Sequence, residues 1–405
     1  MGYETYRIAD LIDEIAMGPF GSNIKVSCFV DSGVPVLNGS NLEGFSLSEK
    51  TFRYVTREKA DSLNKANAHR GDIVITHRGT LGQIVFIPQD SKYDRYVISQ
   101  SQFRVRCNDK VLPEYLVYYF HTPIGQHKLL SNASQVGVPA LARPSSTFQQ
   151  IEVVLPELSI QKRVVEIIST IQKKIVNNQE LNDNLMQQAV AIFKSWFVEY
   201  SPFDGIAPKE WKTVNLEKIT ALICRGIAPK YSDNSNQTVI NQKCIRDHMI
   251  DLSQARTHTP KVINEKWLRF GDLLINSTGD GTLGRTAQVW FQPQNITVDS
   301  HVTIVRPAKE NLIFYIGLWG ILHEREIECL HTGSTGQTEL PKERVKALEL
   351  HLPDNGTLDR FNTLIAPMAA AIISKQNENN KLATLRDALL PKLMSGEIDV
   401  SAVQL

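Results

Sequence analysis

Two stretches of the chain have the apolar spacing of long amphipathic helices. Between residues 156 and 201, apolar side chains recur at intervals of mostly three and four residues: Val164, Ile168, Ile171, Ile175, Leu185, Ala189, Ile192 and Trp196. Between residues 354 and 405 they recur at Phe361, Ile365, Met368, Ile372, Leu382, Leu385, Leu389 and Leu393. This period predicts two helices of about 40 residues each, with Pro367 and Pro391 expected to kink or end the second one locally.

Helices of that length need a partner, and each predicted helix is the simplest partner for the other. Both have one apolar stripe and similar lengths, which favours an antiparallel coiled coil. Both stripes are interrupted by polar residues, at 177–184 and at 375–381. Two interpretations stay open: a polar layer that fixes the helix register, or solvated stretches where the helices splay apart.

The remainder of the chain alternates short β-rich runs with Gly, Asn and Pro turns. Residues 72–76, 83–87 and 272–276 are typical strands, and residues 113–120 resemble a helix. This mixture predicts an α+β class. The expected organisation is a first mixed domain at 1–155, a long helix at 156–201, a second mixed domain at 202–353 and a second long helix at 354–405.

An internal repeat of about 200 residues supports that organisation. Residues 70–82 and 270–284 share a Gly-Asp pair at an offset of 200 and a Gly-Thr-Leu-Gly block at an offset of 202. Residues 103–106 match 303–306, again 200 apart, and the Leu-Pro pairs beginning at 155 and 352 are 197 apart. Similar offsets kept in order predict two pseudo-repeated domains.

Composition is that of a globular protein and announces no particular partner. The chain has 405 residues, of which 42% are hydrophobic and 21% charged, and its formal net charge is +1. DNA binding would therefore depend on locally arranged basic residues. The five cysteines are widely spaced without a C-x-x-C pair, which suits a reducing cytoplasm. The charged beginning and the lack of an 18-residue apolar run predict no secretion signal and no membrane span.

Motifs for catalysis or metal binding are absent from the sequence. It has no G-x-x-x-x-G-K-[ST], H-E-x-x-H or G-x-S-x-G motif. His69 and His77 are not completed by a Cys or carboxylate pattern that would hold a metal ion. We therefore expect a binding protein that has no cofactor of its own.

The repeated glycine-rich loops are candidate ligand sites. Residues 279–284 fit G-x-G-x-x-G, but the residues that follow alternate like a strand, where a dinucleotide site needs a helix. Backbone can approach a ligand closely at such a loop. The flanking donors suit phosphates or base edges, and the candidates are Arg78, Thr80, Ser277, Thr278 and Arg285. A plain hairpin turn remains the alternative.

A second polar loop occurs late in each half, at residues 134–145 and 331–341. Amide, hydroxyl and guanidinium groups can all read base edges. The candidates for base contacts are Gln135, Arg143, Thr335 and Gln337. The alternative is that these loops are only solvated.

Three helix-flanking segments carry a family resemblance. Residues 155–163 open the first helix, residues 193–197 close it, and residues 390–398 close the second. With two variable α+β domains, each followed by a long helix, the chain resembles the specificity subunit of type I restriction–modification systems. The resemblance covers essentially the whole chain.

The resemblance implies that each mixed domain is a target recognition domain for one half of a split double-stranded DNA site. The helix pair would set the spacer and dock two methyltransferase (modification) subunits, and restriction subunits would join them. S-adenosylmethionine, ATP and Mg would belong to those partners. Phe193, Trp196 and Phe197 are candidate assembly residues, with core packing as their alternative role. A two-headed scaffold that binds proteins without reading DNA remains the alternative function.

Overall fold

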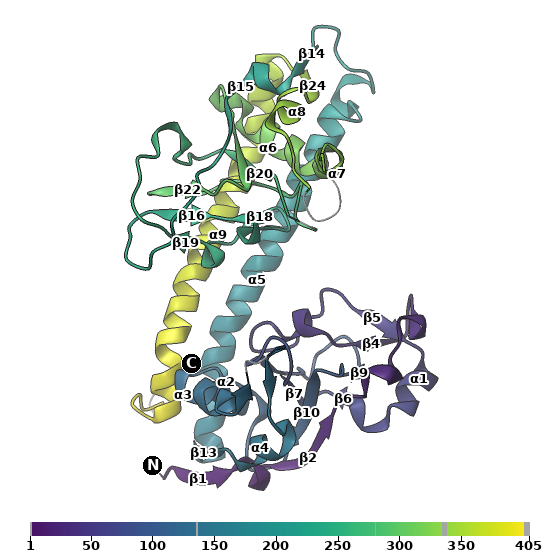
Figure 1. Cartoon of the computed structure of the whole chain (residues 1–405), viewed down its shortest axis with the longest axis vertical. Coiled ribbons are helices and arrows are strands. Elements are labelled where there is room, and N and C mark those ends of the chain that lie inside the picture. The colour runs from purple at the N-terminus through teal and green to yellow at the C-terminus, as the bar shows by residue number, and fades with distance from the viewer. Residues whose placement is uncertain (1, 135–136, 280, 334–337, 401–405) are drawn as a thin grey trace. The chain divides into compact units, whose positions relative to one another are not determined.

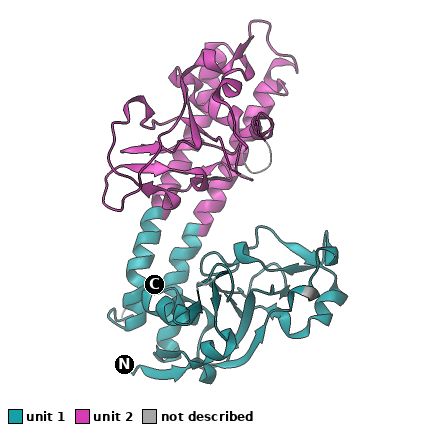
Figure 2. Cartoon of the chain, in the orientation of Figure 1, with its two compact units in different colours: residues 1–175, 380–405 teal, residues 176–379 magenta. Residues whose placement is uncertain are grey.

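The computed structural model describes residues 2–134, 137–279, 281–333 and 338–400. The chain divides into two compact units (Figure 2): unit 1 contains residues 1–175 and 380–405, and unit 2 contains residues 176–379. Each unit combines one of the repeated α+β segments with parts of two long helices. The expected α+β class is confirmed.

Unit 1 contains two main sheets (Figure 1). The first has the order β2(Ile12–Met17)-β10(Gln102–Cys107)-β7(Ile73–Thr76)-β8(Ile84–Phe86), with every neighbour antiparallel. The second has the order β3(Phe29–Val30)-β5(Arg53–Val55)-β4(Val34–Val36)-β9(Arg95–Val97)-β6(Asn67–His69). The remaining elements are the pairs β1(Glu4–Arg7)-β13(Glu152–Leu155) and β11(Ala133–Ser134)-β12(Ala140–Leu141), and the helices α1(Arg57–Ser62), α2(Pro113–Phe120), α3(Pro123–Leu130) and α4(Pro144–Gln150).

Unit 2 repeats this plan. Its first sheet has the order β15(Thr220–Arg225)-β23(Val302–Pro307)-β20(Leu273–Asn276)-β21(Thr286–Gln288), and its second the order β19(Arg256–Thr257)-β16(Thr238–Ile240)-β22(Ile296–Val298). The remaining elements are the pairs β14(Lys212–Asn215)-β24(Glu349–Leu352) and β17(Ile245–Arg246)-β18(Met249–Ile250), and the helices α6(Ile313–Leu322), α7(Glu324–Cys329) and α8(Lys342–Lys346).

The central strands are apolar on both faces because each face meets a different layer. Ile73 and Ile75 of β7 pack in a core with helix α2, whereas Val74 between them packs against the second sheet. In unit 2, Leu273 packs with helix α6 and Leu274 packs against the second sheet. Burial on both faces explains why these strands are continuous apolar runs instead of alternating ones.

The long helices are α5(Leu158–Phe197) and α9(Asn355–Ser395), of 40 and 41 residues. In unit 1 the beginning of α5 shares a core with the end of α9, for example Val164 with Leu393. In unit 2 the end of α5 shares a core with the beginning of α9, for example Phe193 with Phe361. The helices are therefore antiparallel, as expected.

Of the two expected effects of the prolines, a kink or an end of the second helix, the end does not occur. Helix α9 continues through both Pro367 and Pro391. A proline removes one backbone hydrogen bond, but apolar side chains on either side of each proline, such as Ile365 and Ile372 around Pro367, remain packed in the core. Packing of the apolar stripe holds the helix together across the interruption.

The polar stretch in unit 2 is a packed layer. Asn178 of α5 is fully buried. Its Nδ2 atom donates to Glu378 Oε2 at 3.0 Å and to Asn379 Oδ1 at 2.8 Å on α9. These bonds join the two helices at one register, which supports the polar-layer interpretation.

A glycine turns the chain away from the first sheet at the same place in each unit. A Cβ atom on Gly18, after β2, would lie 1.9 Å from the carbonyl oxygen of Ser99. A Cβ atom on Gly226, after β15, would lie 2.0 Å from that of Val298. Backbone fills the space that any side chain would need, so only glycine fits at either bend.

Candidate nucleic-acid interface

The repeated Gly-Asp pair anchors the strand that leads into each glycine loop. In unit 2, Asp272 accepts hydrogen bonds from Arg306 Nε at 2.8 Å and Nη2 at 2.7 Å. The backbone amide of Arg269 also donates to this carboxylate, at 2.8 Å. Asp272 is fully buried. A bidentate guanidinium together with a backbone donor satisfies a buried carboxylate, so this repeated motif is structural.

Unit 1 contains the same anchor in a wider network. Asp72 accepts hydrogen bonds from Arg106 Nε at 2.9 Å and Nη2 at 3.2 Å. Arg104 reaches the same carboxylate at 3.4 Å and also donates to Glu14 at 2.7 Å. The aspartates are 200 residues apart, as are Arg106 and Arg306. Both glycine loops therefore start from equivalent strand ends.

The two loops that the sequence suggested separately form one edge in each unit. In unit 1, Arg78 forms an antiparallel bridge with Ala140, and the amide of Leu141 donates to the carbonyl of His77 at 2.9 Å. In unit 2 the equivalent bridge joins Thr278 to Glu339. We call this paired arrangement the loop edge. In each unit this bridge joins the two loop segments that the sequence singled out.

In unit 1 the loop edge presents free donors. Arg78, Thr80 and Arg143 are exposed. Their side chains make no hydrogen bond or ion pair with any residue that the structure describes. Arg143 has φ of 48°, a left-handed backbone conformation at the start of α4. The remaining unit 1 candidate, Gln135, lies outside the described residues.

In unit 2 most of the predicted polar groups are bonded inside the protein. Ser277 is fully buried and its hydroxyl lies 2.6 Å from that of Thr303. Thr278 Oγ1 accepts from Gln242 Nε2 at 2.6 Å, and Arg285 Nη2 donates to the carbonyl of Gly281 at 2.8 Å. The hydroxyl of Ser277 is thus bonded inside the protein and does not face a ligand. Thr335 and Gln337 lie outside the described residues.

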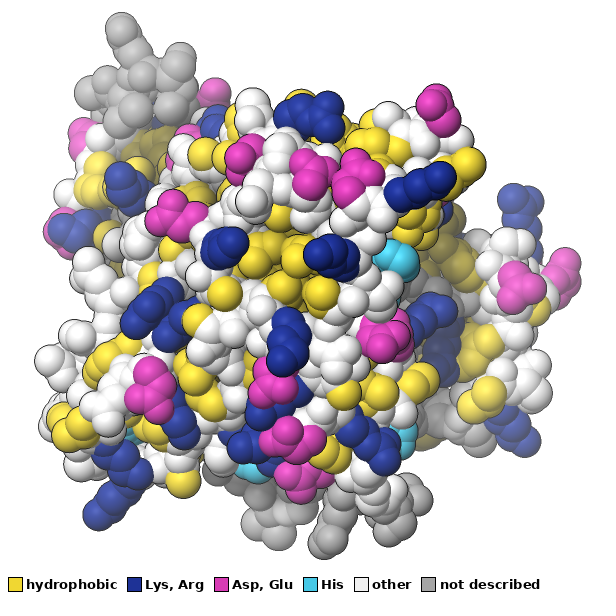
Figure 3. All heavy atoms as spheres, turned by 90° about the horizontal axis from the view of Figure 1, so that it is seen from above, with side chains coloured by type: hydrophobic (Ala, Val, Ile, Leu, Met, Phe, Trp, Pro, Cys, Tyr) yellow, Lys and Arg dark blue, Asp and Glu magenta, His cyan; other side chains and the backbone are white. Residues whose placement is uncertain are grey.

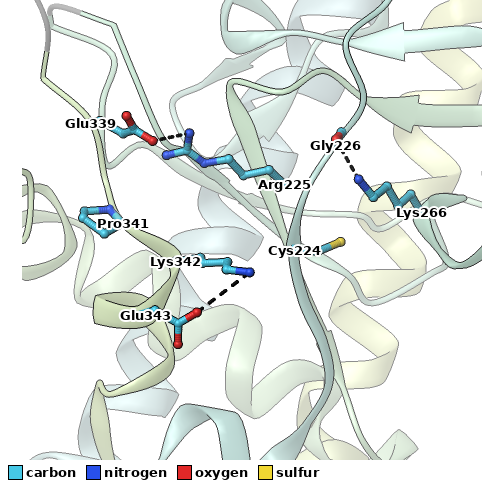
Figure 4. Close-up of a pocket in the computed structure, with 8 residues that line it drawn as sticks. All are labelled: Cys224, Arg225, Gly226, Lys266, Glu339, Pro341, Lys342 and Glu343. Carbon is cyan, nitrogen blue, oxygen red and sulfur yellow. Dashed lines mark hydrogen bonds and ion pairs between the residues drawn. The ribbon is translucent and has the colours of Figure 1, made fainter.

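A groove of about 510 Å³ adjoins the loop edge of unit 2 (Figure 4). Three cationic side chains line it. Arg225 pairs with Glu339 at 2.5 Å and also donates to the carbonyl of Leu340 at 2.8 Å, while Lys266 donates to the carbonyl of Gly226 at 3.0 Å. The full lining is Cys224, Arg225, Gly226, Lys266, Glu339, Pro341, Lys342 and Glu343.

Sequence reasoning missed this groove because its residues come from three distant segments. The only local signal was the cluster of charged residues at 342–346. On the face drawn in Figure 3, Lys and Arg side chains lie among Asp and Glu instead of gathering in one patch. On this face, a polyanion would meet individual cations rather than a uniform field.

The aromatic cluster at the end of α5 is divided between core and surface. Phe193 and Phe197 are only 1% and 6% exposed and pack with Tyr315 and Phe361. Trp196 is half-buried, with its ring near those of Phe361, Phe197 and Phe203. Core packing accounts for the two phenylalanines. Only Trp196 keeps part of its ring at the surface of the unit, and assembly through this cluster stays a prediction.

The described residues hold no cluster of three or more His, Cys, Asp or Glu side chains suited to a metal ion. All five cysteines are free thiols. Burial raises the pKa of Cys107 to about 12 and that of Cys244 to about 11, so both remain protonated at neutral pH. No helix in the described ranges is both long and apolar enough to cross a membrane.

The described residues thus form two repeated sheet domains, each with a loop edge and each packed on antiparallel long helices. Residues 2–187 match the family model for the type I restriction modification DNA specificity domain. This match, which covers less than half of the chain, confirms the resemblance seen in the sequence to the specificity subunit of type I restriction–modification systems.

Relatives of this family match nearly the full chain. The type I restriction enzyme MjaIX specificity subunit of Methanocaldococcus jannaschii is 24% identical over 429 residues, which cover 98% of this chain and 94% of that protein. The HindI specificity subunit of Haemophilus influenzae is 22% identical, covering 81% and 87%. The crystal structure of the type I S subunit from M. genitalium has a TM-score of 0.57 at 14% identity, covering 97% and 96%, and thus shares the fold.

Proposed function

We propose that each unit of this specificity subunit reads one half of a bipartite DNA site through its loop edge. The observation that carries the proposal is the bridge between the glycine loop and the second loop, which recurs at equivalent positions in both units. Phosphate contacts position a protein on DNA, and base contacts select the sequence. Both kinds of contact need donors held at a defined edge.

The chemistry of the edge supports DNA as the ligand. Arg78 and Arg143 are exposed and unpaired among the described residues. An arginine can bind guanine in a bidentate fashion or contact a phosphate. The match to a DNA specificity domain favours this function over a scaffold that binds proteins alone. Lys266 and Lys342 of the unit 2 groove would contact the backbone beside the bases that are read.

The other subunits would supply the catalytic chemistry. The long helices would dock two modification subunits, which carry S-adenosylmethionine, and restriction subunits, which use ATP and Mg. Trp196 is the residue of its cluster with ring surface left for such a contact. The complex would act on cytoplasmic double-stranded DNA. This chain would contribute specificity and assembly without a catalytic step of its own.

An exchange of domains tests the proposal. Residues 1–155 are replaced by the equivalent segment of a relative, and the methylated motif is determined by sequencing the DNA of a host that also expresses the modification subunit. One half of the motif should change while the other half and the spacer remain. The reciprocal exchange of residues 202–353 is the matched control and should change the other half. A single exchange that alters both halves would contradict independent reading.

A binding assay separates DNA readout from pure scaffolding. The complex with modification subunits is titrated with a fluorescent duplex that contains the motif found by methylation sequencing. Specific binding should be typically 10³–10⁷-fold tighter than binding to a scrambled duplex. Normal assembly without any preference for the motif duplex would favour the scaffold.

A further inference from the structure

An arginine stacks on an aromatic ring at the outer edge of the second sheet in both units. In unit 1 the Cζ atom of Arg53 lies 5.2 Å from the centre of the Phe29 ring. In unit 2 the Cζ atom of Arg256 lies 3.8 Å from the centre of the Tyr231 ring. Both distances are within the ~6 Å over which a cation and an aromatic face attract each other.

The aromatic residues occupy the same place relative to their arginines. Phe29 of β3 pairs with Val55 of β5, which stands two residues after the unit 1 arginine. Tyr231 forms a bridge with His258, which stands two residues after the unit 2 arginine. In both units the ring therefore lies on the strand next to the arginine, one diagonal position away, where long side chains reach each other.

The arginines also occupy equivalent positions in their sheets. In unit 1, Arg53 is paired with Val36, which is paired in turn with Val97 on the next strand. In unit 2, Arg256 is paired with Val239, which is paired in turn with Thr297 on the next strand. In each unit the first pair is antiparallel and the second parallel. Val97 and Thr297 are 200 residues apart, the offset of the Gly-Asp repeat. The stacked pair is thus a feature of the repeat, although no sequence motif marks it.

Both guanidinium groups are available to a ligand. Arg53 and Arg256 are exposed, and neither guanidinium makes a hydrogen bond or ion pair with any residue in the described part of the chain. By contrast, Arg225 and Arg306 are bonded to carboxylates. The ring restricts each guanidinium while its N–H edges stay open. A pre-positioned guanidinium loses less side-chain entropy when it binds an anion.

The ligand must offer the same group to both units. The loop edges differ between the units in their polar side chains, as expected for different bases, whereas the stacked pair is retained. In a DNA duplex the part that does not change with sequence is the phosphate backbone. We propose that Arg53 and Arg256, each held by its aromatic partner, bind phosphates of the DNA duplex. This inference rests on the proposed function and adds an interaction that is independent of sequence.

The test measures DNA affinity at several salt concentrations with the assembled complex of this chain and its modification subunits. The double variant Arg53→Ala/Arg256→Ala should bind the motif duplex and a scrambled duplex more weakly by a similar factor, roughly tenfold. The slope of log affinity against log salt should become shallower by about 0.9 for each phosphate that is no longer neutralised. The methylated motif should be unchanged, because neither substitution touches a base.

Three variants serve as controls. Arg53→Lys/Arg256→Lys keeps both charges and should retain most of the salt slope. Phe29→Leu/Tyr231→Leu removes the rings and should weaken binding less than the alanine variant does. Arg246→Ala removes one exposed arginine that is paired with Asp247, and its salt slope should equal that of the wild type. Melting temperatures of all variants confirm that each complex is folded.

Two outcomes would overturn the inference while leaving the proposed function intact. One is unchanged affinity and salt slope in a folded double alanine variant, which would make the stacks purely structural. The other is loss of the modification subunits with normal DNA affinity in the complexes that still form, which would make the stacks a protein-docking surface. If the wild-type complex itself showed no preference for the motif duplex, the proposed function would fail, and the inference with it.

Discussion

The two glycine loops start from the same frame and present different chemistry. Each follows a strand anchored by a buried aspartate, and each pairs with a second loop at an equivalent bridge. In unit 1, Arg78 and Thr80 face solvent, whereas in unit 2 Ser277 is buried and Arg285 is bonded to the loop backbone. If the loop edge binds DNA as proposed, the shared strand and bridge would determine where the ligand binds, and the loop side chains would determine which of its groups are contacted.

The largest expected difference between the units is the loss in free energy of unfolding when the arginine bonded to the buried aspartate is removed. Arg306 is 6% exposed, and Arg306→Ala would leave Asp272 buried without its charge partner, at a cost of about 3–5 kcal/mol. The Arg106 side chain is 42% exposed, and Arg104 would remain near Asp72, so Arg106→Ala should cost only about 1–2 kcal/mol.

Urea unfolding of the two variants, followed by tryptophan fluorescence and circular dichroism, measures this difference. Arg306→Lys is the control, since it keeps the charge and loses the bidentate geometry, and it should lie between Arg306→Ala and the wild type. Equal losses for the two alanine variants would show that exposure does not distinguish the two anchors.

The helix ends differ in a similar way, with aromatic side chains closing α5 and aliphatic ones closing α9. Trp196→Ala should weaken assembly with the modification subunit by about 2 kcal/mol, roughly thirtyfold, if its ring is an interface anchor. Leu393→Ala, in the core of unit 1, should lower stability by about 2–5 kcal/mol instead. Size-exclusion chromatography and calorimetry of the mixed subunits, together with thermal melts, measure both. A Trp196→Ala complex that assembles normally would assign Trp196 to packing.

The two loop arginines should differ in DNA affinity. Arg78→Ala removes an exposed guanidinium and should weaken binding of the assembled complex by about 1–2 kcal/mol, roughly tenfold. Arg285→Ala should have a smaller effect, about two- to threefold, because that guanidinium already donates to the carbonyl of Gly281. Fluorescence anisotropy with the motif duplex measures both affinities. Unchanged binding for Arg78→Ala with normal assembly would leave the loop as a plain turn.

The smallest effect concerns pH, and histidines of the two units should act in opposite directions. The ion pair with Glu324 raises the pKa of His248 in unit 2. Burial alone would raise the pKa of Glu324, but bonds from His248 and Thr286 outweigh it and lower that pKa. This pair therefore stabilises unit 2 most between the unfolded pKa values of about 4.5 and 6.5. The contribution of His248 is lost as pH rises through its raised pKa, and that of Glu324 as pH falls through its lowered one.

In unit 1, burial lowers the pKa of His121, whose ring lies 2.9 Å from the carbonyl of Ile84. Its neutral form is stable in the fold, so stability should be lost as pH falls below about 6.5. Unfolding curves at pH 5.5 and 7.5 test both residues. His248→Gln should be less stable than the wild type at pH 5.5, with a smaller difference at pH 7.5, and His121→Gln should reduce the acid sensitivity of unit 1. Unchanged pH profiles in both variants would show that neither histidine contributes to the pH dependence of stability.

Much of the frame could be predicted from the sequence, because long apolar periods and repeated blocks are local signals. Helices α5 and α9 follow directly from their stripes. The second sheets escaped prediction, since strands of two or three residues such as β3 and β19 leave no measurable alternation. The tertiary structure also overrode one local expectation. Ser277 follows a strand like a loop donor, but it is fully buried, with its hydroxyl bonded to that of Thr303.

The site itself could be predicted only in fragments. Each loop was visible as a polar segment, whereas the bridge that joins Arg78 to Ala140 depends on two segments about 60 residues apart. The unit 2 groove and the stacked arginines also arise from residues that become neighbours only on folding. Such contacts have no local sequence signature, because their physical basis is the register between strands.

The space around each glycine determines which positions of the chain can tolerate substitution. At Gly18 and Gly226 every substitution would collide with backbone, so selection should purge change at both positions. At Gly79 and Gly281 the space beside Cα is open, and the barrier to substitution is the positive φ of the backbone. Loop residues can therefore be substituted over evolution while the glycines that each domain needs for folding are retained. If the loop edge reads DNA as proposed, new DNA targets would arise by accumulation of point mutations in the glycine loops, without an unstable intermediate.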